Sequence, residues 1–187
     1  MKVSETGLPG VLVVEPKIHS DSRGYFLETF NAERYLGAGV PDYFVQDNLS
    51  FSKANVLRGL HFQHPNGQGK LVYAVEGEIF DVAVDVRDGS PNFAHWSAEI
   101  LSADNGLQLY IPEGFAHGFC VLSETARVAY KCTAAYDAKA EMTIRWDDPD
   151  IAIAWPLTDP LVSKKDAAAP LLRDIARKRL PKYRAPK

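Results

Sequence analysis

Three side chains with complementary chemistry lie close together in the sequence. Arg58 and His61 belong to the strand-like run RGLHFQ at residues 58–63, and Lys70 follows nine residues after the histidine. An imidazole can accept a proton, a guanidinium can bind a phosphate with paired hydrogen bonds, and an ammonium can stabilise a developing oxyanion. The combination is suited to proton abstraction beside a carbonyl group on a phosphorylated substrate.

The spacing of these residues predicts an irregularity in the strand that carries them. Strict alternation would place Arg58 and His61 on opposite faces, because they are three residues apart. Gly59 lies between them, and a glycine inside a strand often marks a β-bulge that shifts the phase of the side chains. We therefore expect a bulge within residues 57–62.

A metal site is the main alternative for this region. His61, His64 and His117 could together bind a divalent ion inside a β-barrel. However, ligands on one face of a strand are two residues apart, whereas His61 and His64 are three apart. No carboxylate lies between His64 and Glu76 to complete a typical ligand set, and the ammonium of Lys70 would repel the ion. We expect no metal, and the structural alternative for His61 is a hydrogen-bonded histidine of the core.

Further polar residues lie inside or beside apolar segments. Arg23, Glu28, Gln46 and Asn48 could face solvent at the edge of a sheet, or could line a pocket and bind a base or sugar by hydrogen bonds. The sequence favours neither alternative. Tyr136 follows a strand-like segment and is most simply interpreted as a loop anchor.

Tyr130 and Asp166 each have a structural and a chemical interpretation. Tyr130 shares a strand face with Val128 and Cys132, which favours packing, although a buried phenol with a partner can donate a proton. Asp166 could cap a final helix. It could instead reach back to orient His61 and stabilise its imidazolium form.

Most of the chain consists of short strand-like segments separated by Gly, Pro and Asp turns, which predicts a β-sandwich or small barrel in a single domain over residues 1–187. Strands are expected at residues 11–15, 25–30, 44–51, 70–75, 79–86, 96–101, 107–111, 118–122, 126–133 and 142–146, with a hairpin turn at 76–78.

In the segment 79–86, Phe80, Val82, Val84 and Val86 share one face, opposite Asp81 and Asp85. In the segment 44–51, Gln46, Asn48 and Ser50 share one face, opposite Val45, Leu49 and Phe51. We also expect a short helix from Asn31 to Leu36, a helix opened by Pro170, and a basic tail from about residue 177 that frays.

The bulk composition excludes several classes of protein. With 46% hydrophobic and 24% charged residues, the chain has the composition of an ordinary globular domain, and its formal net charge of −3 argues against general nucleic-acid binding. No apolar run reaches the length of a membrane span. Two cysteines, Cys120 and Cys132, do not make a disulfide framework. Since the N-terminus also lacks an apolar signal-peptide core, we expect a cytoplasmic protein.

Seven segments in order resemble one family closely. They are DSRGYFLE at residues 21–28, QDNLS at 46–50, RGLHFQ at 58–63, QGKLV at 68–72, IPEGFAHGF at 111–119, YKCT at 130–133 and SKKD at 163–166. In this pattern the chain resembles the nucleotide-sugar epimerase family of dTDP-4-dehydrorhamnose 3,5-epimerase over roughly residues 8–170. The resemblance implies an all-β, cupin-type jelly roll that needs no metal or other cofactor. It also implies a homodimer in which the N-terminal segment of one subunit reaches the partner's site, with no nucleic-acid or membrane partner.

The resemblance also implies roles for individual residues. His61 would be the base and Asp166 its partner, Tyr130 the acid on the opposite face of the sugar ring, and Lys70 the group that stabilises the enolate oxygen. Substrate-binding positions would be Arg23 and Arg58 at the diphosphate, Glu28, Gln46, Asp47 and Asn48 in the nucleotide and sugar pocket, and His117, Tyr136, Glu141 and Lys165.

The implied reaction inverts C3 and C5 of dTDP-4-dehydro-6-deoxy-D-glucose, because its C4 ketone acidifies the hydrogens at both carbons. No redox cofactor is needed, and no Gly-rich nucleotide fingerprint follows a strand. One departure bears on this reaction: family members often read Thr-Asp-Tyr-Tyr where this chain has TAAY at residues 133–136. Epimerisation at C3 or C5 alone is therefore an alternative. A non-catalytic nucleotide-sugar binding domain and a metal-dependent cupin are the other two.

Overall fold

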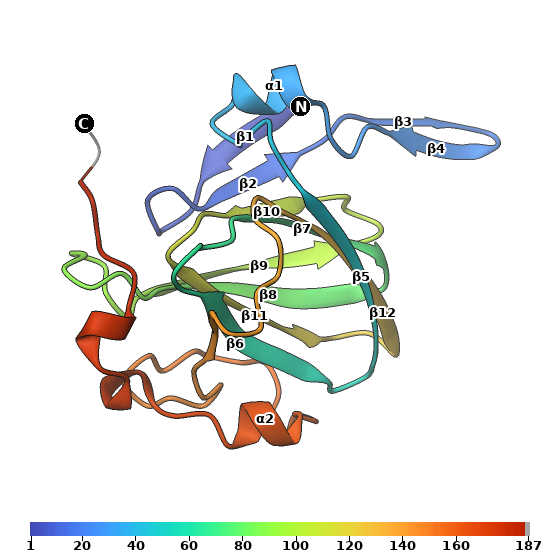
Figure 1. Ribbon diagram of the computed structural model, residues 1–187. Helices are drawn as coiled ribbons and strands as arrows, with labels where there is room; N and C mark the ends of the chain where they lie inside the picture. The colour runs from blue at the N-terminus through green and yellow to red at the C-terminus, as the bar shows by residue number, and fades with distance from the viewer. Residues whose placement is uncertain (186–187) are drawn as a thin grey trace.

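The protein is built around two antiparallel β-sheets that face each other, as seen in a computed structural model that describes residues 1–185 (Figure 1). The six-stranded sheet has the order β1 (Lys2–Glu5), β2 (Leu12–Glu15), β10 (Gln108–Ile111), β7 (Lys70–Glu76), β12 (Thr125–Cys132), β5 (Gln46–Lys53). The five-stranded sheet has the order β13 (Glu141–Thr143), β6 (Leu57–Gln63), β11 (Phe115–Val121), β8 (Glu78–Asp85), β9 (Trp96–Ser102). The expected all-β sandwich is confirmed.

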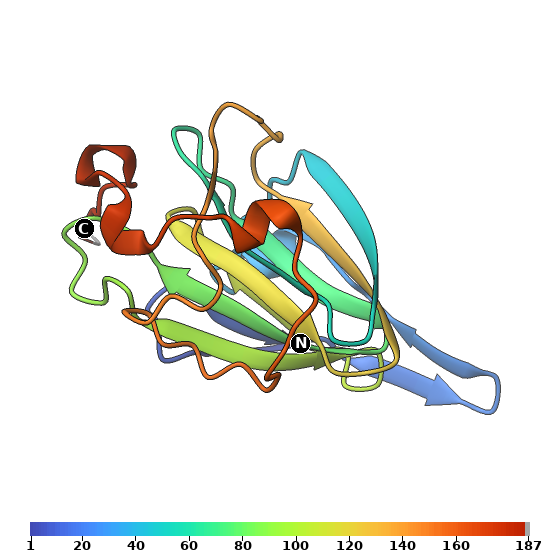
Figure 2. The same ribbon diagram turned by 90° about the horizontal axis from the view of Figure 1, so that it is seen from below.

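A separate hairpin of β3 (Ile18–Asp21) and β4 (Gly24–Leu27) projects away from the two sheets (Figures 1 and 2). We refer to residues 18–27 as the arm. Its aromatic side chains Tyr25 and Phe26 are 60% and 71% exposed. After the arm in the sequence, the helix α1 (Ala32–Leu36) begins as expected, with the Asn31 side chain accepting a hydrogen bond from the backbone N–H of Arg34.

Alternating side chains build two buried layers on the five-stranded sheet. Ile79 and Ala83 of β8 point between the sheets and join the central core, whereas Val82 and Val84 point outward. The C-terminal part of the chain covers this outward face, and Leu172, Ile175 and Leu180 pack there. Both faces of β8 are therefore buried, and the predicted alternation is confirmed.

The hairpin predicted at residues 76–78 is wrong. β7 pairs with β10 and β12 in one sheet, whereas β8 pairs with β9 and β11 in the other. Gly77 has a φ of +73°, and its backbone carries the chain from one sheet to the other. The turn signal was correct, but strand partners are decided by packing between segments far apart in the sequence.

The helix predicted from Pro170 is also wrong. Two single 3₁₀ turns, η1 (Leu172–Asp174) and η2 (Arg177–Arg179), occur there instead. The Asp148 side chain accepts the Leu172 backbone N–H at 2.6 Å, and extended backbone after each turn lets apolar side chains reach the sheet.

The basic tail does not fray over the described residues. Arg177 and Lys182 both pair with Asp88, and Leu180 is 1% exposed. This part of the prediction is wrong because the tail carries its own apolar anchor and ion pairs. Residues 186–187 of the predicted tail lie outside the described residues.

The predicted bulge in β6 is confirmed. On β11, His117 pairs with His61 and Phe119 pairs with Arg58, so a step of two residues on β11 matches a step of three on β6. Gly59 has a φ of +122°. As a result Arg58 and His61, which regular alternation would separate, line the same cavity.

Replacing Gly59 tests how strongly the fold depends on this bulge. A Cβ at position 59 would lie 2.6 Å from Gly118 Cα and 2.8 Å from the carbonyl oxygen of His117. Since both neighbours are backbone atoms, we expect Gly59→Ala to lower the free energy of unfolding by about 3 kcal/mol in urea denaturation. The control is Gly7→Ala, whose Cβ would meet nothing within 4 Å, with an expected change below about 0.5 kcal/mol. Equal stability of the two variants would contradict this account of the bulge.

Candidate active site

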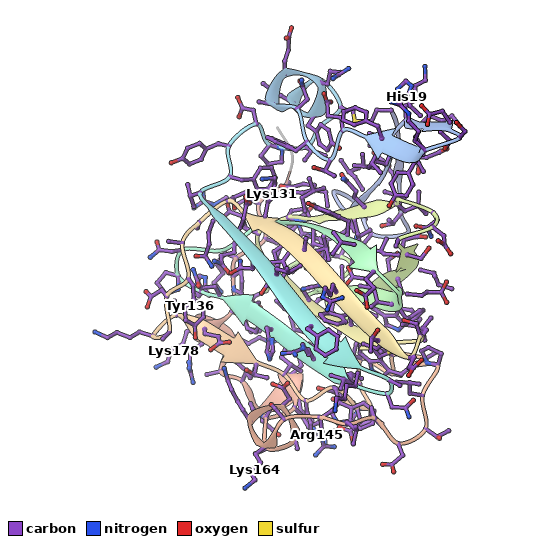
Figure 3. The ribbon with its side chains drawn as sticks, turned by 90° about the vertical axis from the view of Figure 1, so that its right-hand side faces the viewer. His19, Lys131, Tyr136, Arg145, Lys164 and Lys178 are labelled. Atoms are coloured by element: carbon purple, nitrogen blue, oxygen red, sulfur yellow. The ribbon has the colours of Figure 1, made fainter. Side chains whose placement is uncertain are left out.

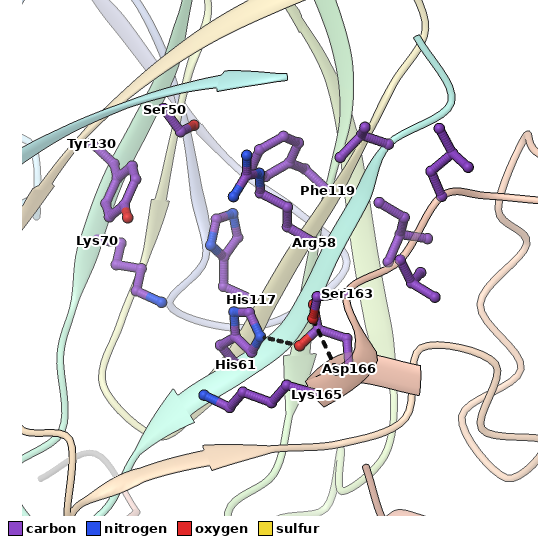
Figure 4. Close-up of a pocket in the computed structure, with 14 residues that line it drawn as sticks. Ser50, Arg58, His61, Lys70, His117, Phe119, Tyr130, Ser163, Lys165 and Asp166 are labelled. Carbon is purple, nitrogen blue, oxygen red and sulfur yellow. Dashed lines mark hydrogen bonds and ion pairs between the residues drawn. The ribbon is translucent and has the colours of Figure 1, made fainter. Parts of the chain in front are cut away.

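A cavity of about 550 Å³ opens between the two sheets (Figure 4). Its polar lining comes from β5, β6, β7, β11, β12 and the segment before and within α2 (Lys164–Ala167), and consists of Ser50, Arg58, His61, Lys70, His117, Tyr130, Ser163, Lys165 and Asp166. A second cavity of about 240 Å³ shares His61, Lys70 and Tyr130 and extends to Gln46, Asn48, Tyr136 and Glu141. The two cavities therefore form one site around three of the predicted catalytic residues.

His61 and Asp166 form a hydrogen-bonded pair. The distance from His61 Nε2 to Asp166 Oδ1 is 2.7 Å, and the side chains are 31% and 5% exposed. Ser163 caps α2 by accepting the Asp166 backbone N–H, and Leu161, bonded to Leu57 of β6, anchors this segment beside the histidine. The predicted reach of Asp166 to His61 is thus realised in the geometry.

Two opposing effects act on the Asp166 carboxyl. Burial alone would raise its pKa. The opposing effects are the hydrogen bond and charge of His61, with further hydrogen bonds from Ser163 and the Gly59 backbone. Together they outweigh burial and hold the pKa below the ordinary value of 3.8. Asp166 is therefore ionised at neutral pH and can stabilise a charged imidazolium.

Tyr130 and Lys70 approach the cavity from the six-stranded sheet, opposite the sheet that carries His61 (Figure 4). Tyr130 packs partly on the central core, yet it also lines both cavities. Burial raises the pKa of its phenol, so the hydroxyl keeps its proton at neutral pH. Burial lowers the pKa of the Lys70 ammonium, and Cys132, Asp81 and Glu141 oppose that change.

A second histidine–aspartate pair is more deeply buried than the first. His117 Nε2 is 2.7 Å from Asp81 Oδ1, and their side chains are 8% and 0% exposed. Burial lowers the pKa of His117, and its bond to Asp81 works in the opposite direction. Sequence reasoning did not identify Asp81 as part of this site. The available signal was an acid in the middle of an apolar strand.

The alternating strand β5 directs its polar face into the site. Gln46 and Asn48 line the smaller cavity and are joined by a 2.9 Å hydrogen bond, and Ser50 lines the larger one. The apolar residues Leu49 and Phe51 are 66% and 48% exposed on the outer face, which Figure 3 presents. Of the two alternatives for Gln46 and Asn48, the structure supports the pocket lining.

The rim of the smaller cavity is held by a short polar network. The Tyr136 hydroxyl donates to Glu141 Oε2 at 2.9 Å, and Lys165 Nζ donates to the same oxygen at 2.5 Å. Burial would raise the pKa of Glu141, but these two partners outweigh it and lower the pKa. Tyr136 lies at the periphery of the molecule, as labelled in Figure 3.

Three predicted binding residues lie outside the cavity of this chain. Arg23 is at the tip of the arm, where its side chain is 88% exposed and pairs with Asp21. Glu28 pairs with Arg34, and Asp47 pairs with Lys131 on the outer face of β5. Within one chain, these three residues are therefore not placed to contact a ligand in the cavity.

The histidines of the metal alternative do not meet. His61 and His117 line the main cavity, whereas His64 lines a separate one beside Glu113. Over residues 1–185, no group of three or more His, Cys, Asp or Glu side chains is arranged to hold a metal ion. None of the helices within residues 1–185 could span a lipid bilayer.

Comparisons with known proteins agree on one family. The family model described as dTDP-4-dehydrorhamnose 3,5-epimerase matches residues 5–174. A Neisseria gonorrhoeae protein of that name is 52% identical over 170 residues, which cover 90% of this chain and 52% of that longer protein.

Two solved structures extend the comparison to the fold. The Legionella pneumophila dTDP-6-deoxy-D-glucose-3,5-epimerase, crystallised with dTDP-4-keto-L-rhamnose, has a TM-score of 0.96 at 50% identity, covering 98% of this chain and 99% of that one. A Streptomyces bikiniensis 3'-monoepimerase, crystallised with dTDP-quinovose, has a TM-score of 0.89 at 36% identity, covering 95% and 91%. The fold is the cupin-type jelly roll that the sequence resemblance implied.

The depressed pKa of Asp166 predicts how stability depends on pH. A carboxyl whose folded-state pKa lies below its unfolded-state value contributes stability above the unfolded value, and this contribution is lost as pH falls through the folded value. We expect the stability advantage of the wild type over Asp166→Asn to be present at about pH 5 and to shrink below about pH 3.8. Urea unfolding at a series of pH values measures it. The exposed Asp159 provides the control Asp159→Asn, which should show no such change. A constant difference for Asp166→Asn down to about pH 2 would contradict the assignment.

Proposed function

The chain belongs to the dTDP-4-dehydrorhamnose 3,5-epimerase family and is an isomerase, and we propose that it converts dTDP-4-dehydro-6-deoxy-D-glucose to dTDP-4-dehydro-L-rhamnose by inverting C3 and C5. One observation carries the proposal. The His61–Asp166 pair and the Tyr130 phenol line one cavity from opposite sheets, with Lys70 beside them (Figure 4). A flat, activated sugar ring between them would have a base on one face and an acid on the other.

Each step of the reaction uses a group in this cavity. His61 removes the proton beside the C4 ketone, and Asp166 stabilises the resulting imidazolium. The electron pair moves onto the C4 oxygen, where the Lys70 ammonium stabilises the enolate. Tyr130 then donates its proton to the same carbon from the other face, which inverts it, and exchange with solvent resets both groups. No electrons are gained or lost, so the reaction needs no redox cofactor, and the Lys70 ammonium supplies the positive charge at the enolate oxygen.

Binding of the substrate is assigned to the residues around these groups. Arg58 lines the larger cavity, donates to Ser52 Oγ and the Phe51 carbonyl, and would bind the diphosphate. Gln46 and Asn48 offer amide groups for the base or sugar, and His117 lines the floor. Lys165 and Glu141 border the opening, and Tyr136 provides an aromatic wall.

Solvent deuterium tests the acid and base assignments separately. In the wild type we expect deuterium at both C3 and C5 of the dTDP-keto sugar, measured by NMR. His61→Ala should lower turnover by about 10²- to 10⁴-fold with little change in nucleotide affinity. Tyr130→Phe should leave exchange faster than inversion, because the base can return a proton only to the face from which it took one.

The matched control for the base is His64→Ala, since His64 lines a different cavity, and it should keep near-normal turnover. The enzyme assignment is falsified if the wild type incorporates deuterium at neither carbon, which would leave the non-catalytic binding domain.

Epimerisation at C3 alone is the second candidate, and a specific observation favours keeping it. Ala134 and Ala135 leave the loop beside the smaller cavity without bulky side chains, and the Streptomyces 3'-monoepimerase shares the same fold. Deuterium at C3 with none at C5 would select this candidate over double inversion.

We further propose a homodimer in the cytoplasm, with each arm completing the partner's site. The outer face of β5 exposes Leu49 and Phe51, and the arm exposes Tyr25 and Phe26. Apolar surface of this kind is typical of an interface. Arg23 at the tip of the arm would then bind the diphosphate in the partner's cavity. The two thiols are free and buried, which suits a reducing compartment.

Mixing two inactive variants tests this arrangement. Arg23→Ala removes the arm's contribution, and His61→Ala removes the base. If the arm serves the partner's site, mixed dimers contain one intact site, so equal mixing should restore up to about a quarter of wild-type activity. Sedimentation analysis checks that dimers form and exchange. Absence of recovery in proven mixed dimers would show that Arg23 acts in its own subunit.

A further inference from the structure

The loop that carries Tyr136 has few side chains of its own that could hold its backbone in place. Ala134 and Ala135 offer only methyl groups, and the Tyr136 side chain is 54% exposed at the rim of the smaller cavity. Among the side chains of residues 134–136, the Tyr136 hydroxyl alone makes a hydrogen bond, to Glu141. An exposed aromatic ring on such a loop would lose conformational entropy on binding unless the backbone were already fixed.

Three glutamines from separate parts of the chain bind the backbone of this loop. Gln46 Oε1 on β5 accepts the Tyr136 N–H at 2.8 Å. Gln68 Nε2, just before β7, donates to the Ala134 carbonyl at 2.7 Å. Gln63 at the end of β6 bonds on both sides of Tyr136.

Gln63 is the best placed of the three. Its side-chain amide donates to the Ala135 carbonyl at 3.2 Å and to the Asn66 carbonyl at 2.6 Å, and its oxygen accepts the Asp137 N–H at 2.9 Å. The residue is 4% exposed, so losing these partners would leave buried polar groups unsatisfied. Gln63 is also two residues from His61 and shares its strand face. One strand thus carries both the base and the amide that holds the loop.

We propose that Gln63, assisted by Gln46 and Gln68, is a positioning residue that fixes Tyr136 in its binding orientation before the substrate arrives. This inference rests on the proposed function, in which Tyr136 contacts the substrate. The backbone bonds replace the ordering that side chains at positions 134 and 135 would otherwise supply. Gln63 acts through Tyr136 on binding, so its effect is separate from the proton transfers at His61 and Tyr130.

The test is a double-mutant cycle with Gln63→Met, which keeps the side-chain length and removes every hydrogen bond. We expect KM for the dTDP-keto sugar to rise roughly tenfold, with kcat within about twofold of wild type. In a Tyr136→Ala background, Gln63→Met should raise KM no further, because the ring it positions is gone. Gln68→Met removes a single bond and should give a smaller rise that also disappears in that background. Gln68→Met takes the place of Gln63→Met in the cycle if Gln63→Met does not fold.

Asn105 provides a matched control. Its side-chain amide also makes three backbone bonds, accepting the Ser102 and Leu107 N–H groups and donating to the Ile100 carbonyl, in a turn that does not line the site. Asn105→Leu should lower thermal stability comparably but leave KM unchanged.

Two results would overturn the inference: an equal rise in KM in the Tyr136→Ala background, or a fall in kcat without a rise in KM. If the wild type shows no turnover, the proposed function fails on its own. The same cycle is then read from the dissociation constant of dTDP, where an additive effect of Gln63→Met and Tyr136→Ala overturns the positioning role and a non-additive effect supports it.

Discussion

One extra residue in β6 determines the geometry of the site. The bulge at Gly59 turns Arg58 and His61 toward the same cavity, and the Gly59 backbone also donates a hydrogen bond to Asp166. A glycine is needed because the β11 backbone passes so close that no side chain would fit. Arg58, His61 and Asp166 are therefore all positioned by a single local distortion.

The two histidine–aspartate pairs differ in how exposed their imidazoles are to the cavity. His61 is 31% exposed and faces the open cavity, whereas His117 is 8% exposed and bonded to a fully buried carboxylate. The first pair is open to water or a ligand on the imidazole side, with an ionised Asp166 behind it. The second pair is shielded, and its histidine lines the same cavity with little exposed surface. Burial, more than residue type, separates the two pairs.

The strand β5 has an unusual pattern for the edge of a sandwich. Its polar residues Gln46 and Asn48 point inward and its apolar residues Leu49 and Phe51 point outward. An isolated domain would gain stability from the opposite arrangement. The pattern makes sense if the inner face binds a polar ligand and the outer face meets a second subunit, which also accounts for the solvent-exposed arm and for Arg23 at its tip.

The sequence by itself determined most of the strands, although not β1 and β3, together with the turn signals, the α1 cap and the bulge at Gly59. Alternation, capping and glycine conformations depend on near neighbours. The ordered motifs also pointed to the family and to the residues that line the cavity. Tertiary structure alone decided that β7 and β8 lie in different sheets, that the tail packs on Asp88, and that Asp81 meets His117. It also brought Asp166 to His61 across 105 residues. These outcomes depend on which distant surfaces pack together, and the energy of that packing is not encoded in any short stretch of the chain.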